Sequence, residues 1–119
     1  MKSIMYSSLA LVLCATPGTA QTVGGLYHVQ GSNFDGSPYS GTANIVISGD
    51  GSCRIIWITG STSSEGVCMQ NGASVAAGYL LQKQVGVVIY DVKPNGSLDG
   101  VWTLAGRSGR GTELLTPRH

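Results

Sequence analysis

The sequence predicts an all-β domain: a single small antiparallel eight-stranded meander, closed into an up-and-down barrel or, alternatively, folded as a small β-sandwich. The tripeptides Asp-Gly-Ser at 35–37 and 50–52 and Asn-Gly-Ser at 95–97 each stand between runs rich in Val, Ile, Tyr and Trp. The dipeptides Asp-Gly and Asn-Gly within them indicate hairpins, because both residues tolerate the positive φ of a type I′ turn. Predicted strands recur about every ten residues, which is typical of small barrels and sandwiches.

Eight runs rich in β-branched and aromatic residues define the strands. The connections between them contain Gly, Asn, Asp, Pro or Ser, which favour turns. A window with some helical character, 73–81, contains only three Ala before Gly78, so we predict a strand there. In chain order, the expected strands are Gly25–Gln30, Ser40–Ser48, Cys53–Thr59, Gly66–Gln70, Ser74–Gln82, Val85–Val92, Leu98–Ala105 and Thr112–Thr116.

Two of these strands share a pattern after a Gly-Ser turn, with Gly41 and Gly100 at the same position. A glycine inside a strand marks a sharp bend or a place where another group packs on bare backbone. In a narrow barrel we expect an aromatic ring from the neighbouring strand to fill that place. Period-two alternation then predicts a core of Tyr39, Ile45, Ile47, Ile55, Trp57, Tyr79, Leu81, Val87, Ile89, Trp102 and Leu104.

Residues 1–20 have the three parts of a secretory signal peptide: Lys2, an apolar stretch at 4–15, and small residues before Ala20. Cleavage after Ala20 leaves 21–119 as a single exported domain, periplasmic or extracellular. A lipid anchor on Cys14 is the less favoured alternative, because Leu13 precedes it where a small residue is expected.

Charge excludes some partners. Without Lys2, six Lys and Arg side chains balance six Asp and Glu side chains, and they are scattered. This pattern argues against nucleic acid, which requires a basic stripe, and against polybasic membrane docking. No second apolar segment approaches the length of a membrane-spanning helix. The oligomeric state is left open.

Cys53 and Cys68 remain after cleavage, and an even number of cysteines in an exported protein indicates a disulfide. Gly60-Ser61 fits a type II′ turn, which pairs Thr59 with Thr62. Counting outward from that pair places Cys53 directly opposite Cys68, within bridging distance. The sequence therefore predicts this disulfide, and two free buried thiols are the alternative.

No group of residues has the chemistry of a catalytic centre. A Ser nucleophile needs a His base and an orienting carboxylate, but His28 is the only His within the predicted strands, and His119 is the last residue. Asp35, Asp50 and Asp99 lie in or beside turns, where Asp caps backbone groups. Two Cys and two separated His do not make a tetrahedral metal site. We expect no enzyme activity, no cofactor and no metal.

Some polar residues stand out as candidate contacts. Glu113, in the closing strand, is predicted to seal the barrel by pairing with an Arg across the seam, or to contact a ligand. Arg54 is a second such polar group. If it lies on the outer face of its strand, it is expected to form a solvent-exposed ion pair with Glu65 that has a structural role only. The Gly-rich stretch with Arg107, Ser108 and Arg110 is a candidate partner-contact loop, although a soluble hairpin tip is the commoner explanation.

Seven stretches along the mature chain form a recognisable pattern: YHVQGSN (27–33), DGSPYSGTA (35–43), CRIIWITG (53–60), GVCM (66–69), GVVIY (86–90), GVWT (100–103) and GTELLTP (111–117). In these stretches the chain resembles a group of small secreted proteins of Gram-negative bacteria that are commonly labelled fibronectin-binding. The resemblance covers nearly all of 21–118 and implies a ligand in the extracellular matrix, without a residue-level site to transfer.

Three functions remain open. The leading expectation is a non-catalytic binding module of the cell envelope or surface, adhesin-like, with a host matrix protein as partner. The first alternative is a periplasmic inhibitor of a lysozyme- or protease-type enzyme, which inserts the loop at 107–110 into the active site. The second is a carrier of a small apolar ligand. A carrier requires an open barrel mouth, and it is excluded if Trp57 and Trp102 are fully packed with no cavity above about 300 Å³.

Overall fold

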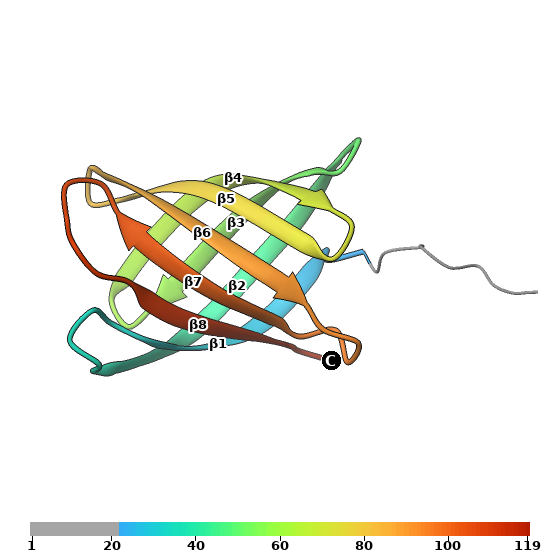
Figure 1. Cartoon of the computed structure of the whole chain (residues 1–119). Helices are drawn as coiled ribbons and strands as arrows, with labels where there is room; N and C mark the ends of the chain where they lie inside the picture. The colour runs from blue at the N-terminus through green and yellow to red at the C-terminus, as the bar shows by residue number, and fades with distance from the viewer. Residues whose placement is uncertain (1–21) are drawn as a thin grey trace, which may run out of the picture.

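Eight antiparallel strands close into one barrel in the computed structural model, which describes residues 22–119 (Figure 1). Each strand pairs with the next along the chain, and β8 pairs with β1, so no edge is left open. The predicted all-β barrel is confirmed, whereas the signal peptide, its cleavage after Ala20 and Cys14 lie outside the described residues. The strands are β1 (Gly25–Ser32), β2 (Pro38–Gly49), β3 (Ser52–Thr59), β4 (Thr62–Asn71), β5 (Ser74–Leu81), β6 (Gln84–Val92), β7 (Leu98–Leu104) and β8 (Gly111–Pro117).

The three Asp-Gly and Asn-Gly signals do mark hairpins, but only one is a two-residue type I′ turn. Asp50 and Gly51 both have positive φ, 48° and 79°, as that turn requires. At 33–37 and 93–97 the loop is five residues long, and only its glycine has positive φ. In both loops, the Asp or Asn side chain accepts a hydrogen bond from the backbone N–H two residues on, forming an Asx turn.

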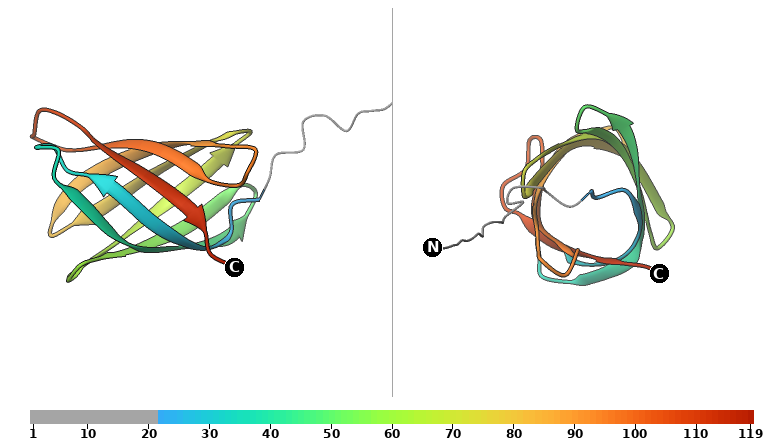
Figure 2. Two further views of the ribbon diagram at one scale, coloured as in Figure 1. Left: turned by 90° about the horizontal axis from the view of Figure 1, so that it is seen from below. Right: turned by 90° about the vertical axis from the view of Figure 1, so that its right-hand side faces the viewer.

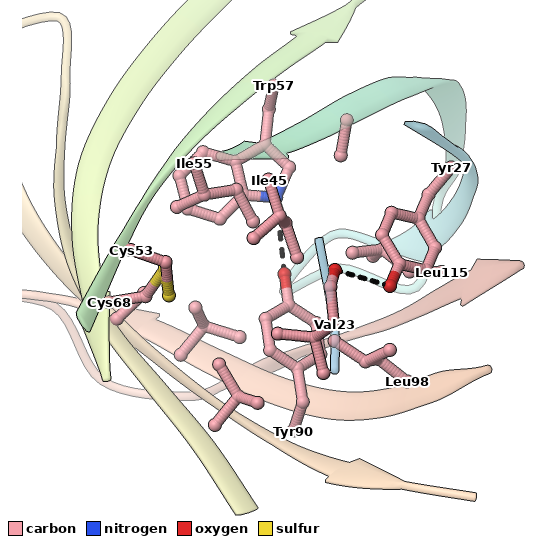
Figure 3. Packing of buried hydrophobic residues seen from close by; sticks show 14 of the residues in the cluster. Val23, Tyr27, Ile45, Cys53, Ile55, Trp57, Cys68, Tyr90, Leu98 and Leu115 are labelled. Carbon is pink, nitrogen blue, oxygen red and sulfur yellow. Dashed lines mark hydrogen bonds between the residues drawn. A yellow bond between two sulfur atoms is a disulfide. The ribbon is translucent and has the colours of Figure 1, made fainter. Parts of the chain in front are cut away.

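The β3–β4 hairpin has the predicted register. Thr59 pairs with Thr62, and Cys53 pairs with Cys68, whose Cα atoms are 4.9 Å apart and whose sulfurs form a disulfide inside the barrel (Figure 3). Strand β4 begins at Thr62, four residues before the predicted Gly66, because the polar residues there still pair with β3.

Glycines inside the strands receive aromatic rings, as the pattern around Gly100 predicted. A Cβ added to Gly100 would lie 2.5 Å from Cδ1 of Tyr90, its neighbour on β6. The Tyr79 ring covers Gly86 in the same way. Gly41 differs, because the backbone of β3 itself comes against it: an added Cβ would lie 2.8 Å from the Cα of Thr59. There the glycine permits a close approach of strands rather than an aromatic contact.

The predicted core is wrong in β6. Val87 and Ile89 point outward and are 51% and 56% exposed, whereas Val88 and Tyr90 are buried. Val and Ile occupy both faces of this strand, so alternation alone does not fix its orientation. At the end of β2, Ile47 is 45% exposed as well. The other predicted core residues are buried or half-buried.

The two ends of the barrel differ. The end that holds the β2–β3 and β6–β7 turns is filled by the segment before β1, whose Val23 is 1% exposed. The Tyr27 hydroxyl donates a hydrogen bond to the Val23 carbonyl at 2.6 Å, which fixes the segment in place (Figure 3). Figure 2 shows this segment entering the ring. The opposite end, which we call the mouth, carries the β1–β2, β3–β4, β5–β6 and β7–β8 loops.

Within residues 22–119, no helix is present that is long and apolar enough to cross a membrane.

Candidate ligand-binding site

A cavity of about 270 Å³ opens at the mouth of the barrel. Side chains from β2, β3, β4, β5, β6, β7 and β8 reach it, because inward-facing residues of a closed barrel converge on one axis. Four aromatic rings and one carboxyl dominate its lining, with hydroxyl groups around them. The lining residues are Asn33, Tyr39, Trp57, Thr59, Thr62, Ser64, Tyr79, Leu81, Val88, Trp102 and Glu113.

The aromatic rings form walls at steep angles to one another. Tyr39 and Trp102 meet edge to face, with centroids 6.3 Å apart and planes at 70°. On the other side, Trp57 and Tyr79 lie 5.2 Å apart at 59°. Edge-to-face and tilted pairs are favourable arrangements of aromatic quadrupoles. Trp57 is 5% exposed, whereas Tyr39, Tyr79 and Trp102 are half-buried.

Glu113 lies in the interior and is 7% exposed. Its Oε1 accepts a hydrogen bond from the Tyr39 hydroxyl at 2.7 Å, and its Oε2 accepts one from Trp57 Nε1 at 3.0 Å. The Tyr90 hydroxyl donates a third hydrogen bond, also to Oε2. Trp57 Nε1 also lies 3.2 Å from the Tyr90 oxygen, which joins the donors into one network (Figure 3). Three donors from three strands therefore converge on this carboxyl.

Burial raises the pKa of the Glu113 carboxyl above its ordinary value, while the hydrogen bonds from Tyr90, Tyr39 and Trp57 act in the opposite direction. The tyrosines respond to the same surroundings. Burial, followed by the nearby Glu113 charge, raises the pKa of Tyr79 to about 12 and that of Tyr90 well above its ordinary value. The tyrosine hydroxyls therefore stay protonated, and remain donors, at neutral pH.

The raised pKa of Glu113 gives stability a predictable dependence on pH. The folded chain binds the Glu113 proton more tightly than the unfolded chain does. The stabilisation of the folded state by this proton is therefore fully present below the ordinary pKa of Glu, about 4.3. It is lost as pH rises through the raised pKa. Glu113→Gln is expected to remove this decrease, and urea unfolding of both proteins between pH 4 and 7 measures it. Equal slopes for both proteins would contradict the assignment. Asp35, whose pKa is lowered, titrates below this window and cancels in the comparison.

Tyr90→Phe is expected to lower the free energy of unfolding by about 2 kcal/mol at neutral pH, because it removes a donor from a buried ionisable acceptor. Tyr27→Phe is the matched control, since it removes a buried hydroxyl that donates to a neutral carbonyl. That control should lose about 1 kcal/mol. Equal losses in urea titrations of the two variants would show that Glu113 carries no charge in the network.

Phe34 and Arg107 form the rim on the Trp102 side. The Phe34 ring stacks on Trp102 with centroids 4.9 Å apart, and the Arg107 guanidinium lies 5.0 Å over the Phe34 ring. This cation–π contact ties the β7–β8 loop to the β1–β2 loop. The candidate contact loop at 107–110 is thus part of the mouth, with Ser108 and Arg110 exposed in it.

The structure separates the two polar groups that the sequence grouped as seam or ligand candidates. Arg54 lies outside the barrel, where it forms an ion pair with Glu65, and both side chains are about half exposed, 55% and 53%. The predicted pairing of Glu113 with an Arg across the seam is wrong: its partners are aromatic donors, because its carboxyl points into the barrel. Cys53 and Cys68 form the predicted disulfide away from the cavity lining.

Two aromatic contributors to the site went unrecognised in the sequence, Tyr90 and Phe34, as did the polar lining residues and Val88. Tyr90 had a signal, since Gly100 was expected to receive an aromatic ring from a neighbouring strand and Tyr90 is that ring. Phe34 had none, because it lies within a loop whose length was not predicted.

The fold has a known counterpart. No protein-family model matches this sequence, and no curated protein is significantly similar to it. Among solved structures, the barrel is similar to a mutant of the fluorescent protein UnaG, with a TM-score of 0.52. The match covers 81% of this chain and 96% of that chain, at 10% sequence identity. At this identity the likeness concerns the β-barrel fold alone.

Proposed function

We propose that the protein is a small-ligand-binding barrel that holds its ligand in the mouth cavity. The observation that carries the proposal is the cavity of about 270 Å³, walled by four aromatic rings around the buried carboxyl of Glu113. Ligand sites are concave, lined by aromatic and apolar groups, and contain a few polar groups that fix orientation. This cavity has each of these properties.

The geometry favours the carrier, the second of the alternatives drawn from the sequence, over a surface binding module or an enzyme inhibitor. A carrier would be excluded if Trp57 and Trp102 were both fully packed. Trp102 is only half-buried, so this condition is not fulfilled. The volume lies slightly below the roughly 300 Å³ at which drug-sized pockets begin. The ligand is therefore smaller than drug-sized, and the acid in the cavity makes it polar at one end rather than wholly apolar.

A screen of small molecules by two-dimensional NMR tests the proposal. The chain has two Trp residues, Trp57 and Trp102, and both line the cavity, so their indole N–H signals report on it directly. The library should contain neutral, cationic and anionic compounds of similar size. We expect some of them to shift both indole signals saturably.

Neighbouring serines supply matched controls. Ser64 lines the cavity, whereas Ser63 faces outward and is exposed. Ser64→Phe fills part of the cavity and should abolish binding, while Ser63→Phe adds the same ring outside the barrel and should leave binding unchanged. If no compound of any class shifts the indole signals, or if Ser64→Phe binds as wild type does, the proposed function is wrong.

A further inference from the structure

Glu113 lies in the mouth cavity without a positive partner. Within residues 22–119, the ion pair that forms is Arg54–Glu65, on the outside of the barrel. The Arg107 guanidinium, which belongs to the rim, lies over the Phe34 ring instead. A buried carboxylate is costly unless it is paired, so a positive charge brought into the cavity would stabilise this acid as an ion.

Every side chain found facing Glu113 is uncharged at neutral pH. Tyr39 from β2, Trp57 from β3 and Tyr90 from β6 donate hydrogen bonds to it. Tyr79 from β5 is close enough for the carboxylate charge to raise its pKa. The three hydrogen bonds favour the ionised form, which accepts all of them. These contacts hold the carboxylate in a fixed position, but they do not neutralise it.

The cavity walls add a second observation, independent of the acid. Tyr39, Trp57, Tyr79 and Trp102 all reach the cavity, and they stand at 70° and 59° within their two pairs. Because these rings belong to β2, β3, β5 and β7, they border the cavity from several sides. The faces of aromatic rings are electronegative, and several of them together recognise ammonium groups, most strongly when water is excluded.

We propose, on the basis of the function proposed above, that the mouth cavity binds a compact organic cation, with its ammonium group against the Glu113 carboxylate and its alkyl substituents against the aromatic walls. An anion would be repelled by Glu113, and a neutral ligand would leave the carboxylate unpaired. The cavity volume limits the cation to a small one. Binding also depends on pH, because a proton and the cation compete for the same carboxylate.

Three probes of nearly the same shape test the proposal: choline, its uncharged analogue 3,3-dimethylbutan-1-ol, and the anion 3,3-dimethylbutanoate. Each is titrated into the full oxidised protein at pH 7 while the two indole signals and the Trp emission are followed. We expect choline to bind at least tenfold more tightly than the uncharged analogue, and the anion to bind weakest. Choline affinity should decrease as the pH is lowered and Glu113 takes up its proton.

Glu113→Gln keeps the shape of the side chain and removes its charge, and is expected to lower choline affinity at least tenfold. It should leave the affinity for the uncharged analogue nearly unchanged. Glu65→Gln is the matched control, since it removes one negative charge from the outer face and should not alter binding. Circular dichroism and urea unfolding confirm that both variants fold.

The outcomes separate this proposal from the one it rests on. If the uncharged analogue or the anion binds as tightly as choline, or if Glu113→Gln binds choline as wild type does, the cavity is a ligand site but the cation is wrong. The cation is equally wrong if the screen finds cavity ligands while none of the three probes binds. If neither the screen nor the probes shift the indole signals, both proposals are wrong.

Discussion

Gly41→Ala is expected to lower the free energy of unfolding by about 3 kcal/mol, the upper end of the usual range for overpacking. The new Cβ would lie 2.8 Å from the Cα of Thr59 and 2.9 Å from the carbonyl carbon of Ile58. These are backbone atoms of β3, and β3 is paired on both sides within a closed barrel. No side-chain rotation relieves the contact, so the sheet itself must deform.

Gly78→Ala is the matched control for this prediction. Gly78 lies on β5, and an added Cβ there meets only the Gly86 carbonyl oxygen at 4.0 Å. Ala at this position should leave stability within about 0.5 kcal/mol of wild type. Urea unfolding followed by Trp fluorescence measures both variants. A loss of less than about 1 kcal/mol for Gly41→Ala would show that β2 and β3 are further apart than described.

Removal of the Cys53–Cys68 disulfide is the second large effect expected. The bridge joins residues separated by 15 positions, and a loop of that length is stabilised by about 3 kcal/mol in the chain-entropy description. The double variant Cys53→Ala with Cys68→Ala should therefore unfold at a markedly lower urea concentration. A small domain with one core depends strongly on such a bridge.

Reduction of the wild-type protein supplies the control. If the bridge acts by restricting the unfolded chain, the reduced wild type and the double variant should lose similar amounts of stability under the same conditions. A double variant as stable as the oxidised wild type would contradict the prediction. Mass spectrometry with thiol labelling confirms the redox state of Cys53 and Cys68 in each sample.

Local rules predicted the strands and one register well. The Gly60-Ser61 turn fixed the alignment of β3 with β4, because a two-residue loop permits a single pairing, and the disulfide followed from it. The loops at 33–37 and 93–97 could not be aligned in this way. A type I′ turn at Asp35-Gly36 would pair Ser37 with Phe34, whereas the five-residue loop pairs Ser32 with Pro38. A shift of one residue reverses which face a side chain occupies.

The orientation of β6 shows a second limit of pattern reasoning. Val85, Val87 and Ile89 on one face and Val88 and Tyr90 on the other are equally apolar. Burial was decided by Gly86, which must face inward to receive the Tyr79 ring. The contact between Tyr79 and Gly86 joins β5 to β6. Gly86 has no side chain, so a hydrophobic pattern within β6 does not reveal it.

The candidate site was predictable in its parts but not as a whole. Tyr39, Trp57, Tyr79, Trp102 and Glu113 were each recognised in the sequence, the rings as core and the acid as a seam or ligand group. Their convergence follows from closure of the barrel, which brings β8 beside β1 and places Glu113 across from β2 and β6. Sequence patterns within single strands do not contain that information.

The segment around Val23 has a kinetic consequence. Because Val23 fills one end of the barrel, a ligand of the proposed site would enter and leave through one port, the mouth, whose rim includes Phe34 and Arg107. A change that only narrows this port slows entry and exit by the same factor. Residence time can therefore be lengthened without a gain in equilibrium affinity, and the two quantities become separately adjustable properties of this barrel.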